Sequence, residues 1–372
     1  MFKKILFFVT LIALFSFGHV SAQHHNSDNH TEGHVESADS HAANGHESKK
    51  LTVKEQIKAD ISHHLLDVHS FHVWKSLDFP LPIILWDNGL HVFSSSRFGH
   101  HADEVAESKG NFYAISHHNG HIYKVDNATD HIKYNDKGYE SNEKPLDLSI
   151  TKNVVMIFIT GLVLFLLFGG LAKSYAKNGK IGKGPGRLLE PIVLYIRDEI
   201  AIPSIGEKHY KKYMNFLLTV FFFIWFVNLF GLTPIGVNVT GNIAVTFSLA
   251  LITYLITTFT AKKDYWKHIF WMPGVPAPMK IILAPIELLG TFVKPFALMI
   301  RLYANIKAGH VVLMSIIGLI FLYKSWVGGP LSFGLAFTLM ILEVLVATLQ
   351  AYIFTALSAL YFGSAAEEHA DH

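Results

Sequence analysis

The sequence predicts an all-α polytopic membrane protein with about five membrane helices, and a small exported α+β domain on the N-terminal side. The last two helices are expected to form a long, steeply tilted hairpin. Of the 372 residues, 51% are hydrophobic, and the mean hydropathy of +0.32 is high for a soluble protein. Apolar stretches long enough to span a membrane recur after residue 149. The segment before them begins like a secreted protein and contains hairpin turn signals.

Residues 1–22 have the parts of a secretory signal peptide. A charged start, "MFKK", precedes the apolar run "ILFFVTLIALFSFGHV", and small residues lead to a cleavage site after Ala22. The run is too short and wrongly flanked for a full membrane span. An uncleaved anchor is the alternative. In both cases the residues that follow are expected outside a bacterial inner membrane.

Residues 23–50 form a histidine-rich leader. Such a tract can gather metal ions, but it also lacks the apolar surface that folding requires. Because the spacings are irregular, a disordered hydrophilic leader is favoured and no metal site is predicted. The histidines are His24, His25, His30, His34, His41 and His46.

Residues 51–148 are expected to form a periplasmic α+β domain. Apolar residues at the start of "TVKEQIKADISHHLLDVHSFHVW" have helical spacing. Two Asn-Gly turns, at Asn88 and Asn119, each separate two apolar runs and predict two β-hairpins. Two further pairs could bind metal, but surface histidines on a small sheet are the favoured interpretation; these are His63/His64 and His117/His118. The residues of this domain do not indicate its function.

Residues 149–372 are expected to form the membrane domain. The last two apolar stretches exceed one span, since at about 1.5 Å per residue they reach about 64 Å and about 48 Å, against a hydrocarbon core of about 30 Å. They must be steeply tilted, or broken, for example at Pro295 or Gly309; tilt is favoured. The expected spans are 153–172, 213–232, 243–260, 281–323 and 331–362.

Lysine and arginine set the predicted orientation. The connection 173–212 is rich in both residues and 261–280 contains four lysines, whereas 233–242 has neither residue and 324–330 has only Lys324. The positive-inside rule places the first two connections in the cytoplasm. Residues 23–152 are then periplasmic and the C-terminus is cytoplasmic, in agreement with the signal peptide. Within the first connection, "LLEPIVLYIRDEIAIPSIG" is typical of an amphipathic element on the membrane surface.

Arg301 stands within the apolar segment 281–323. An arginine there costs roughly 2.5–3.5 kcal/mol on insertion scales, so a functional role is expected. Glu287, Lys294 and Arg301 recur every seven residues and line one helical stripe, with Asn305 one turn further on. Glu287 lies about 21 Å from Arg301 along the axis, and His310 about 14 Å in the other direction.

An antiparallel hairpin with its turn near 323–330 places His310 opposite Glu343. The same register places Arg301 beside Gln350 and Tyr352. A carboxylate and an imidazole in contact can pass a proton near neutral pH. A buried polar pair that only fixes the hairpin register is the alternative.

These groups suggest two offset half-paths for protons, separated by a fixed positive charge. A guanidinium cannot be deprotonated in a protein and therefore blocks a continuous path. Arg301 has no acidic residue at its own level in the sequence, so we expect its partner to be a carboxylate on another subunit. A carboxylate on a moving element would have to release its proton to pass the arginine.

The motifs "RLYANIKAGH" at 301–310 and "LEVLVATLQAYIFTALSALYF" at 342–362 resemble subunit a of bacterial F-type ATP synthases, over about residues 150–372. The resemblance implies that Arg301 is the essential arginine and that Asn305 and Gln350 are its polar neighbours. It implies a cytoplasmic half-channel at Glu287 and a periplasmic one at His310 and Glu343. Asn228 in "FVNLFG" matches a polar residue of an earlier helix. The family often has Glu and His where this chain has His310 and Glu343, an exchange that keeps one of each.

The resemblance also implies a stator subunit that conducts protons beside a rotating c-ring and is no enzyme alone. Its expected partners are the c-ring, the subunit b peripheral stalk, the F1 sector and the lipid bilayer. No cofactor, metal or nucleic acid is implied. A phosphate-binding loop of the type G-x-x-x-x-G-K-[ST] is absent from the sequence. Lys307 is a further intramembrane cation without an assigned role.

Two other functional classes are alternatives. A secondary ion or metal transporter would use the intramembrane Glu and His residues, but it would require repeated halves, and 153–260 does not repeat in 281–362. An assembly factor would need Arg301 only for structure and would tolerate Arg301→Gln. The choice between H⁺ and Na⁺ is left open by the sequence.

Overall fold

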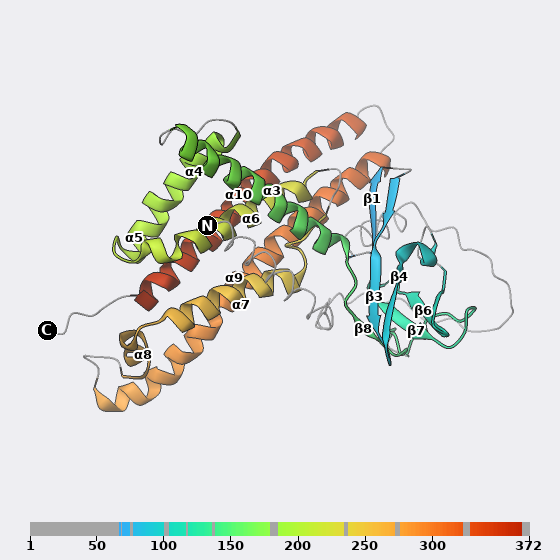
Figure 1. The fold of residues 1–372 in the computed structure, drawn as a ribbon, viewed down its shortest axis with the longest axis horizontal. Coiled ribbons are helices and arrows are strands. Elements are labelled where there is room, and N and C mark those ends of the chain that lie inside the picture. Colours follow the sequence, from blue (N-terminus) through green and yellow to red (C-terminus); the bar gives the residue numbers. More distant parts are fainter. Residues whose placement is uncertain are drawn as a thin grey trace.

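The computed structural model describes Asp67 and residues 69–74, 77–99, 104–116, 118–135, 138–178, 185–233, 237–271, 276–322 and 328–366. The predicted signal peptide, the histidine-rich leader and the predicted helix near residue 51 lie outside the described residues. Figure 1 shows β-strands in the first part of the described chain and helices in the rest.

Five described helices are long and apolar enough to cross a membrane, which confirms the predicted number of spans. The helix α9 is continuous through Pro285 and Pro295, so the predicted alternative of a broken segment is wrong. With 46 residues it is about 69 Å long, which leaves tilt as the means of fitting a bilayer. The bounds are α3 Lys152–Asn178, α6 Tyr210–Gly231, α7 Ile243–Thr260, α9 Ala277–Leu322 and α10 Gly328–Ala366.

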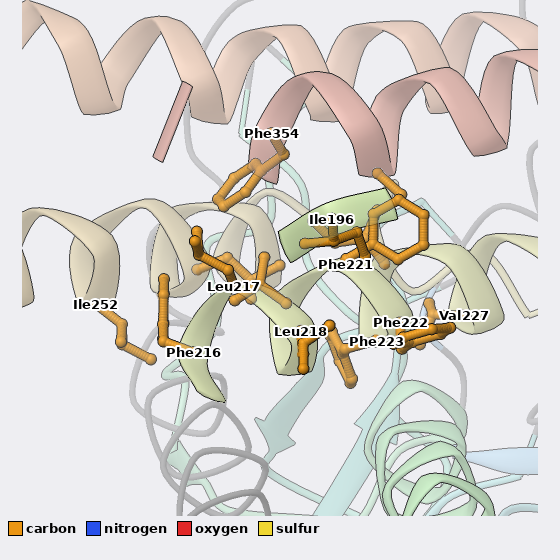
Figure 2. Packing of buried hydrophobic residues seen from close by; sticks show 14 of the residues in the cluster. Ile196, Phe216, Leu217, Leu218, Phe221, Phe222, Phe223, Val227, Ile252 and Phe354 are labelled. Carbon is orange, nitrogen blue, oxygen red and sulfur yellow. The ribbon is translucent and has the colours of Figure 1, made fainter. Parts of the chain in front are cut away.

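The helix α10 packs against both α6 and α9, while α7 packs against α9. Figure 1 shows α9 and α10 side by side as the predicted hairpin. The core lies around α6, where Phe222 and Phe223 are fully buried, and Figure 2 shows the ring of Phe354 on α10 pointing toward α6 near Leu217. The ring of Phe222 also meets Phe168 of α3 edge-on at 5.0 Å. Aromatic packing therefore fixes α3 and α10 on α6.

Short elements connect α3 to α6: η3 (Pro185–Leu189), α4 (Glu190–Tyr195), the π-helical η4 (Ile196–Ala201) and α5 (Ile202–Ile205). Ile196 and Ile200 are buried, whereas Arg197 and Asp198 are exposed and form an ion pair at 2.7 Å. The segment is therefore two-faced, as the sequence predicted.

The end of α10 passes unusually close to α5. A methyl group placed on Gly363 would overlap the backbone carbonyl of Ser204, so the contact requires glycine. Nearby, the ring of Phe362 stacks on Tyr213 of α6 at 4.6 Å. The backbone N–H of Lys262 donates to the carbonyl of Ala365 at 3.1 Å. The C-terminal end of α10 is thus attached to three neighbouring elements.

The strands of the N-terminal part, here called the β domain, form three antiparallel sheets in the orders β1–β2, β4–β3–β8 and β5–β6–β7. Both predicted hairpins are confirmed: β3 and β4 flank Asn88, and β6 and β7 flank Asn119. Their bounds are β1 Ser70–Trp74, β2 Leu77–Pro80, β3 Pro82–Trp86, β4 Leu90–Ser94, β5 Ala106–Ser108, β6 Asn111–Ile115, β7 Ile122–Val125 and β8 Leu146–Asp147, with a 3-10 turn η2 at Ser95–Phe98.

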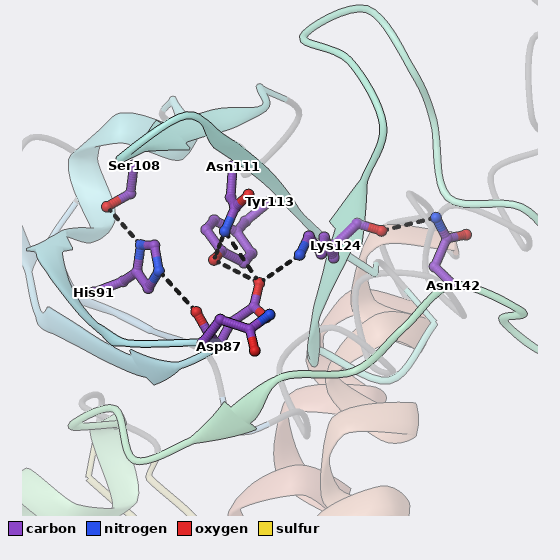
Figure 3. A network of polar contacts seen from close by, with 8 residues as sticks. Asp87, His91, Ser108, Asn111, Tyr113, Lys124 and Asn142 are labelled. Atoms are coloured by element: carbon purple, nitrogen blue, oxygen red, sulfur yellow. Dashed lines mark hydrogen bonds and ion pairs between the residues drawn. The ribbon is translucent and has the colours of Figure 1, made fainter.

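A polar network, here called the Asp87 network, joins the two three-stranded sheets (Figure 3). The carboxylate of Asp87 accepts hydrogen bonds from the Tyr113 hydroxyl at 3.1 Å and from Lys124 Nζ at 2.8 Å. His91 lies 3.1 Å from the Asp87 carbonyl and 3.2 Å from Ser108 Oγ. The hydrogen bond from Lys124 lowers the pKa of Asp87. Each charge in this network has its partner within the chain.

Asp67 joins the N-terminal part to two membrane helices. Its carboxylate accepts from Thr151 Oγ1 at 3.0 Å and from the backbone N–H of Asn153 at 3.4 Å, at the start of α3. It also accepts from Asn242 Nδ2 at 3.4 Å, and Asn242 caps α7. Burial raises the pKa of this carboxyl group. One side chain therefore connects the N-terminal ends of α3 and α7.

Candidate functional site

Arg301 lies on an exposed face of α9. The side chains of Lys294, Arg301 and Asn305 are all exposed, while Leu298 and Leu302 on the other face are buried. The seven-residue spacing predicted this stripe. Within the described part of the chain, Arg301 forms no ion pair. The guanidinium is thus presented outward, on a face of α9 that the described residues leave uncovered.

His310 and Glu343 lie at the same level of the hairpin, and each is only 5% exposed. A methyl group on Gly309 would overlap the Glu343 carboxyl group, so that carboxyl fills the space left by the glycine. The structure therefore places Glu343 against the residue before His310, within one residue of the predicted register. The His310 ring approaches α6, where its Nε2 lies 3.5 Å from the position of a Cβ on Gly231. Direct contact between the two side chains stays a prediction.

Asn228 lies one turn before Gly231 on α6 and is 4% exposed. Its Oδ1 accepts a hydrogen bond from Thr240 Oγ1. Its Nδ2 has no hydrogen-bond partner among the described residues. A buried amide with an unused donor is costly, and here it lies on the helix that His310 approaches. The three helices α6, α9 and α10 thus bring Asn228, His310 and Glu343 into one buried polar region.

Gln350 is buried on α10, two turns after Glu343. Glu343, Ala347 and Gln350 share the buried face of this helix at spacings of three and four residues. Arg301 is exposed on α9. A direct contact between Gln350 and Arg301 stays a prediction.

A second polar region lies at the other end of α9. A pocket of about 190 Å³ is lined by residues of α8 (Lys263–Phe270), α9 and α10. Glu287 and Lys294 come from α9 and Ser364 from α10, while α8 contributes Asp264 and His268. Figure 1 shows α8 beside the first turns of α9, far from the end that carries His310.

Sequence reasoning missed Asp264 and His268. Their spacing of four residues places them on one face of a short helix, and that was the available signal. In the connection 261–280, which contains four lysines, however, the same pattern is typical of a solvated helix. Only the fold brings that face to Glu287.

The two polar regions lie on different faces of α9 and on opposite sides of Arg301. Because α9 is unbroken, Glu287 lies about 21 Å and His310 about 14 Å from Arg301 along the axis. Arg301 therefore stands between them. Among the described residues, no group of three His, Cys, Asp or Glu side chains is arranged to hold a metal ion.

Lys307 has a partner on its own helix. Its Nζ donates to the Tyr303 hydroxyl at 2.7 Å, and the ammonium lies 5.1 Å from the centre of the Tyr303 ring. A hydrogen bond and a cation–π contact together reduce the cost of an exposed lysine on a membrane helix.

Comparison with known proteins gives two family matches. The sequence profile described as "ATP synthase A chain" matches residues 154–363, and a "Domain of unknown function (DUF8433)" matches residues 60–148. An "ATP synthase subunit a" of Chloroherpeton thalassium is 44% identical over 61% of this chain and 69% of its own length. One from Myxococcus xanthus is 42% identical over 61% of this chain and 77% of its own length.

Proposed function

The chain belongs to the ATP synthase A chain family, and on this premise we propose that its polar residues form two offset proton half-channels separated by Arg301. As a family member it is a multi-pass membrane protein and a proton-translocating stator component of the Fo sector, and it is no enzyme on its own. Membership also implies a c-ring and other subunits as partners.

The first half-channel runs through the buried region of Asn228, His310 and Glu343. An imidazole and a carboxyl group at one level can exchange protons near neutral pH. The unused amide donor of Asn228 is suited to hold a water molecule on the way in. Glu343 and His310 are each only 5% exposed, so protons that take this path would pass through a buried polar region.

The second half-channel leads through the pocket at Glu287. Asp264 and His268 widen the set of groups that can accept a released proton at its mouth. Lys294 lines the same pocket between Glu287 and Arg301.

The observation that carries the proposal is the position of Arg301 between the two regions, on an exposed face. A c-ring carboxylate that moves across this face would meet the guanidinium and lose its proton, because an adjacent positive charge stabilises the ionised form. Since Arg301 keeps its charge, protons cannot pass directly from one region to the other. Proton flow would then require rotor movement. Asn305 and Gln350 would support the arginine as polar neighbours.

The remaining assignments are parts of the same proposal. A signal peptide at 1–22, a leader at 23–50 and an exported domain at 51–148 would place residues 23–152 in the periplasm. The lysine-rich connection before α6 and the C-terminus would lie in the cytoplasm. The Glu287 pocket would then be cytoplasmic, and contacts with subunit b and the F1 sector would form around the membrane domain at 149–372.

The test is Arg301→Ala in inverted membrane vesicles of the assembled complex, with ATP-driven acidification and passive proton leak followed together. We expect ATP-driven pumping to be lost, because the rotor carboxylate has no cation to meet. Arg197→Ala, which removes an exposed arginine paired with Asp198, is the matched control and should pump normally. Normal pumping and normal leak in Arg301→Ala would mean that the arginine is only structural, and the proposal would be wrong.

A further inference from the structure

One face of the sheet β4–β3–β8 is apolar and uncovered by the described chain. Trp86 is 56% exposed, and its neighbours in the register, Leu90 on β4 and Leu146 on β8, are 46% and 53% exposed. Val92 on β4 is 58% exposed. The three paired residues form one row across the strands. We call Trp86, Leu90, Val92 and Leu146 the outer sheet face.

The opposite face of the same sheet is the core of the β domain. Ile83, Leu85 and Phe93 point to that side and are buried against the second sheet. In a sheet with one solvated face, the outward positions are normally polar. Here the outward positions of β3, β4 and β8 carry no charged residue. An exposed apolar face of this kind marks a contact surface.

The chain itself brings this face close to the membrane. Beyond Asp147 the pairing with β3 continues, since the N–H groups of Leu148 and Ile150 donate to the carbonyls of Ile84 and Pro82. The first membrane helix begins two residues later, at Lys152. Leu146 is therefore at most about 20 Å along the chain from a membrane span.

The direction of the face agrees with this position. In Figure 1 the strands β6 and β7 lie on the side of β3 and β4 that is turned away from the membrane helices. The outer sheet face is thus on the side turned toward them. Asp67 binds Thr151 and Asn242 at the ends of two membrane helices, which limits how far the N-terminal part can swing away.

We propose that the outer sheet face rests on the lipid interface of the bilayer, with Trp86 among the headgroups and Leu90, Val92 and Leu146 against the acyl boundary. Tryptophan is enriched at this depth because its ring is apolar and its N–H needs a polar partner. The bilayer is favoured over a protein partner because the sheet continues directly into a membrane helix. The β domain is then a membrane-surface platform, and this inference does not depend on the proposed half-channels.

The full chain contains no cysteine, so a single introduced cysteine is the one thiol in this chain that a nitroxide reagent can label. Leu90→Cys carries a nitroxide on the outer sheet face, and Glu107→Cys carries one at the exposed position of β5 in the other sheet. Each full-length protein is placed in nanodiscs of phosphatidylethanolamine and phosphatidylglycerol. Collision with oxygen, which concentrates in lipid, is compared with collision with a water-soluble nickel chelate.

We expect the Leu90 label to collide mainly with oxygen and the Glu107 label mainly with the nickel chelate. If the Leu90 label collides with the nickel chelate as often as the Glu107 label, the face is bare and the inference is overturned. If it is shielded from both reagents, another protein segment or a second copy covers it, and the inference is equally overturned. Val92→Cys, on the same face, replaces Leu90→Cys should that variant fail to fold.

Discussion

The β domain and the long hairpin differ in how their charged side chains are paired and exposed. In the Asp87 network, the carboxylate is shielded and meets a lysine, a tyrosine and an asparagine of the same chain. On α9, Arg301 is exposed and forms no ion pair within the described residues. Satisfied groups hold a structure together, whereas an unsatisfied charge on an apolar helix is suited to a partner that comes and goes. The difference predicts which substitutions will damage folding and which will damage transport.

The largest effect is expected at the buried end of the hairpin. His310→Glu or Glu343→His alone places two like groups at one level and should lower ATP-driven pumping by about 100-fold or more, the usual size for loss of an acid–base group. The double exchange should restore pumping in inverted vesicles, because one group of each kind is present again. Equal defects in the singles and the double would show that the two residues do not act as a pair.

Asp87→Ala should disrupt the Asp87 network and leave ATP-driven proton pumping unchanged. It leaves Lys124 and Tyr113 without their shared acceptor and should destabilise the β domain by about 3 kcal/mol. Hydrogen–deuterium exchange of residues 104–125 in the full chain would measure this loss. Asp126→Ala, which removes an exposed partner of Lys133, is the control and should leave exchange unchanged. Loss of pumping in Asp87→Ala with a folded β domain would contradict the comparison.

Acidification should weaken the β domain through His121. Burial lowers the pKa of His121 from 6.5 to about 4, so between these values the unfolded chain binds a proton that the folded chain does not. Stability should therefore fall as pH decreases through this window, by about 2 kcal/mol between pH 7 and pH 5. Pulse proteolysis at the two pH values measures this fall. His121→Gln should show a flatter pH dependence, and an equal slope would assign the effect to other groups.

The smallest effect is expected where the two regions meet. Asp67→Ala removes acceptors from Thr151, Asn153 and Asn242 and should cost about 1 kcal/mol, as for other helix caps. Faster amide exchange at the first turn of α3 would report it. Asp67→Asn keeps a side-chain oxygen and should retain most of the protection. If Asp67→Ala and Asp67→Asn lose amide protection to the same extent, the negative charge of Asp67, rather than its hydrogen bonds, stabilises the start of α3.

Much of the membrane domain follows from local sequence features. The spans are set by apolar length, and the position of Glu343 against Gly309 follows from a short turn between two antiparallel helices. The exposed stripe with Arg301 follows from a seven-residue spacing. Each of these depends on residues close in sequence or on one simple geometric rule.

Other features depend on contacts that no local pattern encodes. Asp264 and His268 reach the Glu287 pocket only because α8 folds back on α9. Asp87 stands in a hairpin turn, where aspartate needs no partner, yet the second sheet supplies Lys124. Ser70–Trp74, the end of the stretch whose first residues have helical spacing, form β1 by pairing with β2. In each case tertiary placement decides the role of the residue.

The contact between Gly363 and Ser204 has a mechanical consequence. In the proposed function a rotor turns against the exposed face of α9 and applies torque, and the reaction force would pass into α10, which lies against α9 and α6. At its C-terminal end α10 meets α5 backbone to backbone, without intervening side chains that could bend. That junction connects one end of a helix about 58 Å long, given 39 residues in α10, directly to the backbone of α5. A larger residue at position 363 would push α10 away from Ser204 and place side-chain atoms between the two backbones. The hairpin would then be held less rigidly at this end.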